Sequence, residues 1–162
     1  MAREFDARST RFGKTLDQFE VGDIFRHWPG KTITEADDHL FSLLTLAASP
    51  LHIDANYAEK NMPNGRNIVI GTYIYSLLTG MSVPDISGRA IASLGVHYLQ
   101  HTAPMYHGDT LYGFTEVLAK RLSVTNPEQG ILTTKTTGIN QKDEIVCTFE
   151  RSILLPVAEV TS

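Results

Sequence analysis

The longest apolar stretch of the chain is residues 67–83, NIVIGTYIYSLLTGMSV, which is hydrophobic on nearly every side of a helix. Such a helix belongs in a protein core, and the stretch is too short to cross a bilayer, which takes about 20 residues. The pattern predicts a central buried helix with Asn67 as its cap. The unpaired backbone N–H groups of its first turn, around Ile70 and Gly71, are expected to form a site for an anion or a carbonyl oxygen.

The chain after this helix has the pattern of a sheet. In the last run the apolar residues Ile145, Cys147 and Phe149 alternate with polar ones, which is typical of a half-buried strand. Residues 84–88 are expected to break the helix, and residues 140–143 to form a hairpin turn. The strands predicted after the helix are residues 91–99, 111–118, 131–139 and 144–155.

A further strand is predicted before the helix. Residues 24–28 form a short apolar and aromatic run that ends at a Pro-Gly pair, and His27 is expected to face solvent on it. The predicted fold class is therefore α+β, with one central helix held against a curved antiparallel sheet of about five strands.

Two more helices are predicted between the first strand and the central helix. Thr34 and Asp37 have the spacing of a capping box, which predicts the start of a helix. The apolar residues that follow are at helical spacing over about three turns, and the helix is expected to end before a Ser-Pro pair. The next residues, 50–53, are expected to form an irregular connection. Asp54 then caps a short helix over residues 55–60.

Composition narrows the classes of function. The 162 residues are 42% hydrophobic and 20% charged with a formal net charge of −4, which fits one globular domain over residues 1–162 and argues against nucleic acid as a partner. The lone Cys147 allows no disulfide framework and no cysteine metal site, which fits the cytoplasm. Residues 1–14 lack the apolar run of a secretory signal, and no membrane partner is expected. These residues are expected to be loosely ordered, with Phe5 and Phe12 as tethers to the body or to a partner subunit.

Four segments together carry a resemblance to a known family. They are FSLLTLAASPLHIDANYA, NIVIGTYIYSLLTG, HGDTLYGFTEVLAKRLS and GINQKDEIVCTFERSILLP. In order and spacing they resemble the MaoC-like enoyl-CoA hydratases of the hot dog fold, over residues 17–156. The resemblance implies a sheet wrapped around a long helix and a homodimer, or a dimer-based higher oligomer, whose sheets join edge to edge. It also implies an acyl-CoA substrate in a tunnel at the dimer interface.

The family's hydration motif, D-x-N-P-x-H, holds a water for addition across the double bond of a trans-2-enoyl-CoA. Pro50 and His52 match this motif, whereas Ser49 stands at the asparagine position and Ala47 at the aspartate position. Alanine cannot orient water or move a proton, so the two-residue acid/base pair is incomplete. The stretch GMSVPDISGRAIASLG looks closer to the mesaconyl-CoA hydratase branch, in which that position need not be aspartate.

Two residues are the candidates for catalysis. His52 is the expected acid and base, because a neutral imidazole titrates near the working pH, with a purely structural histidine as the alternative. The N–H of Gly71, aided by the helix dipole, is the expected donor to the thioester oxygen and can supply about 3 kcal/mol, although a glycine there can also serve close packing alone. Asp54 is assigned to the helix cap rather than to the missing carboxylate. Further residues that could hold water or position the substrate are Thr45, Ser49, Asn67, Ile70 and Thr72.

His97 and His101 are four residues apart, which is a metal spacing on a helix. On a strand four residues span about 13 Å, so the two imidazoles cannot share one ion there. Because the segment is predicted to be a strand, no metal site is expected.

The leading functional hypothesis is reversible hydration of a short, branched or dicarboxylic enoyl-CoA without a metal or redox cofactor. A hot dog thioesterase would use the same tunnel and helix terminus but release free CoA thiol. A non-catalytic acyl-CoA-binding subunit is the third hypothesis, and Ala47 is the argument for it.

Overall fold

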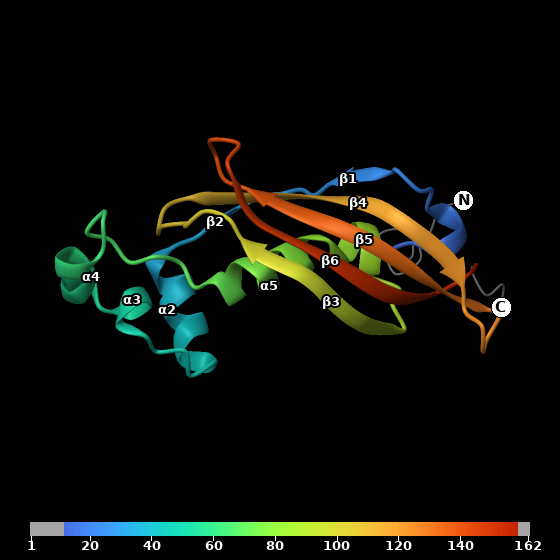
Figure 1. The fold of residues 1–162 in the computed structure, drawn as a ribbon, viewed down its shortest axis with the longest axis horizontal. Helices are drawn as coiled ribbons and strands as arrows, with labels where there is room; N and C mark the ends of the chain where they lie inside the picture. The colour runs from blue at the N-terminus through green and yellow to red at the C-terminus, as the bar shows by residue number, and fades with distance from the viewer. Residues whose placement is uncertain (1–11, 159–162) are drawn as a thin grey trace, which may run out of the picture.

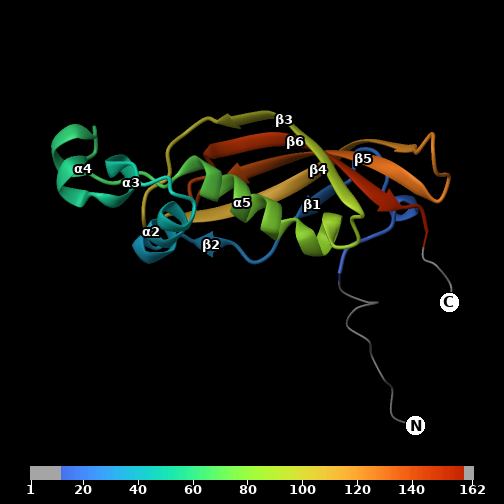
Figure 2. The same ribbon diagram turned by 90° about the horizontal axis from the view of Figure 1, so that it is seen from below.

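The computed structural model describes residues 12–158, and its main feature is one sheet of six antiparallel strands with a helix along one face (Figures 1 and 2). The strand order is β1-β4-β5-β6-β3, and β2 also pairs with β4. The strands are β1 (Ile24–Arg26), β2 (Lys31–Thr32), β3 (Ala92–His101), β4 (Thr110–Leu122), β5 (Gln129–Ile139) and β6 (Ile145–Pro156). The α+β fold class and the five predicted strands are confirmed, and the two-residue strand β2 is the addition.

The central helix α5 (Gly71–Met81) lies against the sheet through Ile74 and Leu78, which are buried. Two glycines that face each other across β4 and β5, Gly113 and Gly138, make this approach possible. A Cβ at these positions would lie 2.9 and 2.6 Å from the methyl carbons of Leu78. The prediction that α5 is buried on nearly every side is wrong for this chain alone, because its face with Thr72, Ser76 and Gly80 is exposed.

Both ends of α5 differ from the prediction. The helix begins at Gly71 with Ile70 as its N-cap, because the buried Asn67 uses its side-chain amide elsewhere. That amide nitrogen donates to the backbone carbonyls of Leu51 at 2.9 Å and of Pro50 and Asp54 at 3.2 Å each. After Met81 the chain does not break into a loop but makes one π-helical turn, η2 (Val83–Ser87).

The helices α2 (Glu35–Leu44), α3 (Pro50–Ile53) and α4 (Ala55–Asn61) gather at one end of the sheet (Figure 1). The predicted capping box at Thr34 and the predicted cap by Asp54 are confirmed. The connection expected to be irregular is instead the short helix α3, which has proline at its first position. A proline suits that position, because the first helical N–H has no intrahelical partner.

Helix α2 turns a polar side inward. Asp38 and Ser42 are fully buried, whereas Leu40, Leu43 and Leu44 are between 58% and 75% exposed. The leucines that give α2 its helical pattern are therefore free to meet another surface, and the inward face carries a carboxylate.

Asp37 anchors the start of α2 and gives a testable prediction. Its carboxylate accepts hydrogen bonds from the ammonium of Lys31 (2.7 Å) and the N–H of Thr34 (2.9 Å). These bonds, that of Lys31 foremost, lower the pKa of Asp37 from 3.8 to about 2. A carboxyl whose pKa is lowered by folding stabilises the protein above its unfolded pKa, and this stabilisation is lost as the pH falls through the folded pKa.

The Asp37→Asn variant is therefore expected to lower the free energy of unfolding by about 1 kcal/mol at neutral pH. The difference from the parent protein should shrink as the pH falls below about 4, since the parent carboxyl then becomes protonated in the unfolded chain. Urea unfolding of both proteins at a series of pH values measures this difference in the free energy of unfolding. A difference that stays constant over that range would mean that the carboxylate charge contributes nothing.

His27 is not the surface residue that was predicted. Its side chain is buried, with Nδ1 donating to the carboxylate of Asp85 at 2.8 Å and Nε2 lying 2.8 Å from Oγ1 of Thr115. Thr115 in turn lies 2.9 Å from the hydroxyl of Thr136. This chain of polar contacts joins the segment after β1 to η2 and to strands β4 and β5, so His27 has a structural role.

The segment before β1 contacts η2. The N–H of Gly13 donates to the carbonyl of Pro84 at 2.7 Å, and a Cβ on Gly88 would lie 2.8 Å from the Phe12 ring. Phe5, the other expected tether, lies outside the described residues.

Within residues 12–158 no helix has the length and apolarity needed to cross a membrane. The cytoplasmic location stays a prediction.

Candidate active site

A pocket of about 320 Å³ opens at the N-terminus of α5. Three elements bring His52, Gly71 and His101 to its wall: α3, the first turn of α5 and the last residue of β3. Apolar residues complete the lining, among them Ile68, Val69, Ile74 and Met105. The two residues predicted for catalysis therefore share one pocket, and a second histidine joins them.

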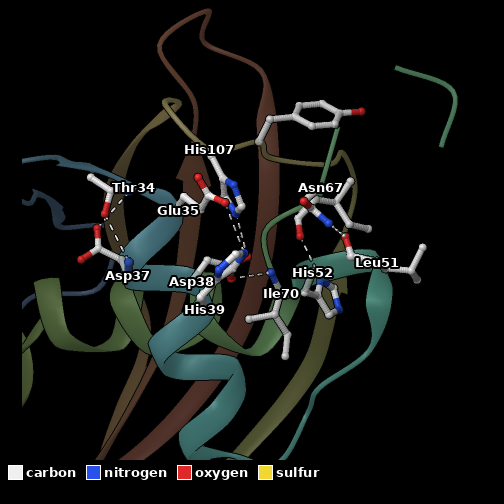
Figure 3. Close-up of polar contacts among 12 residues, drawn as sticks. Thr34, Glu35, Asp37, Asp38, His39, Leu51, His52, Asn67, Ile70 and His107 are labelled. Atoms are coloured by element: carbon white, nitrogen blue, oxygen red, sulfur yellow. Dashed lines mark hydrogen bonds and ion pairs between the residues drawn. The ribbon is translucent and has the colours of Figure 1, made fainter. Parts of the chain in front are cut away.

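His52 is held with one ring nitrogen fixed. Nδ1 lies 2.8 Å from the backbone carbonyl oxygen of Ile68, the contact drawn from the His52 ring in Figure 3. The backbone N–H of His52 donates to the Ser49 carbonyl. A carbonyl only accepts hydrogen bonds, so Nδ1 carries the proton of the neutral imidazole and Nε2 carries the lone pair. His52 can thus take a proton at Nε2 without changing its anchoring bond.

Gly71 is the first residue of α5, and its N–H has no acceptor among residues 12–158. The neighbouring N–H of Ile70 is not free, because it donates to Oδ1 of Asp38 at 3.0 Å (Figure 3). Of the two backbone donors expected at this terminus, Ile70 and Gly71, Gly71 is therefore the one that remains available. The helix dipole places partial positive charge at this end, which favours an oxygen that gains negative charge.

Asp38 organises the start of α5 and was not identified from the sequence. Its side chain is fully buried, and its second oxygen accepts a hydrogen bond from Nε2 of His107 at 3.0 Å. The rings of His107 and His39 meet edge to face at 5.6 Å (Figure 3). Asp38 thus joins α2, the segment before α5 and the loop before β4 at one buried carboxylate.

His101 was considered in the sequence only as half of a metal pair. The strand prediction is confirmed, and the side chain of His101 packs against Gly71, where a Cβ would lie 2.8 Å from Nε2 of the ring. His101 is exposed to the pocket, and its partial burial lowers its pKa below the ordinary value, so the imidazole is neutral at neutral pH. The periodicity of β3 could not reveal this contact, because it depends on a glycine that lies far away in the sequence.

The remaining candidates lie outside this pocket. Ser49 is the N-cap of α3, and Thr72 is exposed on α5. Thr45 donates its hydroxyl to the carbonyl of Phe41 at the end of α2. Asn67 and Ile70 have their polar groups occupied as described above. Roles in substrate binding stay predictions for Ser49, Asn67, Ile70 and Thr72.

Comparisons with known proteins agree with the resemblance seen in the sequence. A family model described as mesaconyl-CoA hydratase matches residues 2–162. The β-methylmalyl-CoA dehydratase of Chloroflexus aurantiacus is 29% identical over 146 residues, which cover 90% of this chain and 41% of that protein. The chain spans about two fifths of the length of the curated relatives it matches.

Solved structures show the same fold. The (R)-hydratase from A. caviae, involved in PHA biosynthesis, superposes with a TM-score of 0.72 at 29% identity, covering 86% of this chain and 98% of that one. A Mycobacterium tuberculosis protein with a double hotdog fold superposes with a TM-score of 0.73 at 25% identity, covering 93% of this chain and 46% of that one. The expected hot dog fold is therefore confirmed.

Proposed function

Because the chain belongs to the mesaconyl-CoA hydratase family, we propose that it adds water reversibly to the double bond of a short enoyl-CoA thioester. The observation that carries the proposal is the pairing of a proton acceptor and an oxyanion donor in one pocket. Nε2 of His52 has a lone pair, the N–H of Gly71 is free within the described chain, and both residues line the space at the start of α5.

In the proposed reaction the thioester oxygen accepts a hydrogen bond from the N–H of Gly71. Nε2 of His52 takes a proton from water as the water oxygen bonds to C3, and negative charge moves from the double bond to the thioester oxygen. The imidazolium then returns a proton to C2, which completes the hydroxyacyl product. Dehydration follows the same path in reverse. The reaction only adds or removes the elements of water and oxidises nothing, so we propose no metal and no redox cofactor.

The acyl group is proposed to be short and branched or dicarboxylic. The description of the matching family and the name of the Chloroflexus relative support this choice. The pocket walls are largely apolar beyond the two histidines, which suits a short carbon chain.

We further propose that two copies of the chain pair through β3, forming a homodimer or a dimer-based higher oligomer. Strand β3 is the edge of the sheet, and Leu94, Val96, Tyr98 and Leu99 on it are between 38% and 76% exposed. An edge with exposed apolar side chains invites pairing with another strand. The similar protein with a double hotdog fold is about twice as long as the part that superposes on this chain, which supports a second copy as the partner.

Sedimentation equilibrium tests this pairing and should give twice the chain mass of 17.9 kDa or a multiple of twice that mass.

A panel of crotonyl-CoA, 3-methylcrotonyl-CoA and mesaconyl-CoA tests the reaction. Loss of the enoyl-thioester absorbance without release of free thiol is the expected result. Thiol release would instead indicate the thioesterase. If a folded protein binds these thioesters but neither the absorbance nor the free thiol changes, the hydratase proposal is wrong. That result would favour the non-catalytic binding subunit, for which Ala47 is the argument.

A further inference from the structure

We propose that His101 is a second donor to the substrate: its Nε2–H binds the thioester oxygen beside the N–H of Gly71. The proposal rests on the function proposed above and extends it to a residue of β3. An oxyanion held by a single backbone donor is stabilised less than one held by two. The pocket wall offers His101 as the side chain next to that backbone donor.

The position of the ring is set by the absence of a side chain at residue 71. A Cβ there would lie 2.8 Å from Nε2, 2.9 Å from Cε1 and 3.0 Å from Cδ2 of His101. The ring edge that carries Nε2 therefore faces the first turn of α5. Any side chain at residue 71 would displace the imidazole, so Gly71 both exposes its N–H and admits His101.

The backbone of His101 is fixed by the sheet. His101 is in register with Cys147 of β6, and the N–H of the next residue, Thr102, donates to the carbonyl of Val146 at 3.1 Å. The side chain is thus presented from an anchored strand rather than from a loop. A donor that is already in place loses little freedom when the substrate binds.

The protonation state suits a donor. Partial burial lowers the pKa of His101, so the ring is neutral at neutral pH and has one N–H. Within residues 12–158 neither ring nitrogen of His101 has a hydrogen-bond partner, which leaves Nε2 able to donate. A neutral imidazole near a helix N-terminus can polarise a substrate carbonyl.

The two histidines then have different tasks. His52 is held by the carbonyl of Ile68 so that Nε2 accepts a proton, whereas no such bond imposes that tautomer on His101. His52 therefore moves the proton, and His101 stabilises charge without changing its own protonation. This division predicts different responses to substitution.

Three variants separate the role of His101 from packing. His101→Phe keeps a ring against Gly71 but removes the donor, and its kcat should fall about 10²-fold with little change in KM. His101→Gln restores an N–H donor without a titrating group and should recover most of that loss. His97→Phe makes the same chemical change on the same strand outside the pocket, so any loss of kcat in it measures the effect of a phenylalanine on the pairing of β3, and the loss in His101→Phe should clearly exceed it. Full activity of His101→Phe, or equal loss in the Phe and Gln variants, would overturn the proposal.

A measurement independent of turnover uses butyryl-CoA labelled with ¹³C at the carbonyl, a saturated thioester that cannot be hydrated. Each hydrogen bond to the carbonyl lowers its infrared stretching frequency. The bound band should lie lower in the parent protein and in His101→Gln than in His101→Phe. Binding with an unchanged band in His101→Phe would overturn the role of His101 alone. Failure of the parent protein to bind butyryl-CoA would overturn the acyl-CoA function and this inference with it.

Discussion

The His52→Gln variant is expected to lose about 10³-fold in kcat on whichever enoyl-CoA the parent protein hydrates, while it remains folded. Glutamine can still donate to the Ile68 carbonyl, which His52 contacts at 2.8 Å, so the anchoring of α3 is preserved. An amide cannot accept a proton from water near neutral pH, so only the acid–base step is removed. The effect exceeds the one expected for His101→Phe, because the other imidazole of the pocket, His101, is proposed to present its N–H and not a lone pair to the substrate.

The control for His52 is His97→Gln, the same change on β3 at a histidine outside the pocket. Steady-state kinetics should show parental kcat for this control, and thermal unfolding should show similar stability for all three proteins. If His52→Gln kept parental kcat, His52 would be structural and the proton acceptor would have to be sought elsewhere. A rise in KM with parental kcat would assign His52 to substrate binding.

Much of the fold could be predicted from the sequence because its main elements are long and periodic. In strand β6 buried and half-buried positions alternate from Cys147 to the end of the strand, and the stretch that forms α5 is mostly apolar, so each signal accumulates over many positions. Short elements carry no such signal. Strand β2 has two residues and α3 has four, and both were missed or assigned to an irregular connection.

Polar residues that turn inward were the harder part of the prediction. His27 follows a three-residue strand, too short for alternation to decide which side faces the core. Asp38 lies in a helix whose leucines suggested the opposite face as the buried one. The placement of His52 and Gly71 in one pocket, in contrast, could be predicted because a contiguous motif and a helix terminus mark them. Asp38 and His101 act through partners 32 and 30 positions away, which only the fold brings close.

Asp38→Ala is expected to cost about 3 kcal/mol in the free energy of unfolding, the largest stability effect among the variants considered. The carboxylate is fully buried and accepts from two donors, the N–H of Ile70 and Nε2 of His107, at 3.0 Å each. Alanine leaves the Ile70 N–H buried without an acceptor and leaves a space beneath α2. Asp38→Asn keeps the volume, and its amide can accept from Ile70 while its NH₂ donates to His107. Its cost should therefore be about 1 kcal/mol.

The same pair of variants tests whether Asp38 positions the catalytic helix. Ile70 directly precedes Gly71, so loss of its hydrogen bond should let the first turn of α5 shift and lower kcat by up to about 10²-fold in Asp38→Ala. Measured at a temperature where both variants are folded, kcat should fall far less in Asp38→Asn, whose charge is gone but whose acceptor remains. Equal losses in the two variants would mean that the charge of Asp38, and not its hydrogen bond to Ile70, supports catalysis. Because Gly71 supplies the proposed oxyanion donor, the bound-carbonyl infrared band should rise in Asp38→Ala together with the fall in kcat.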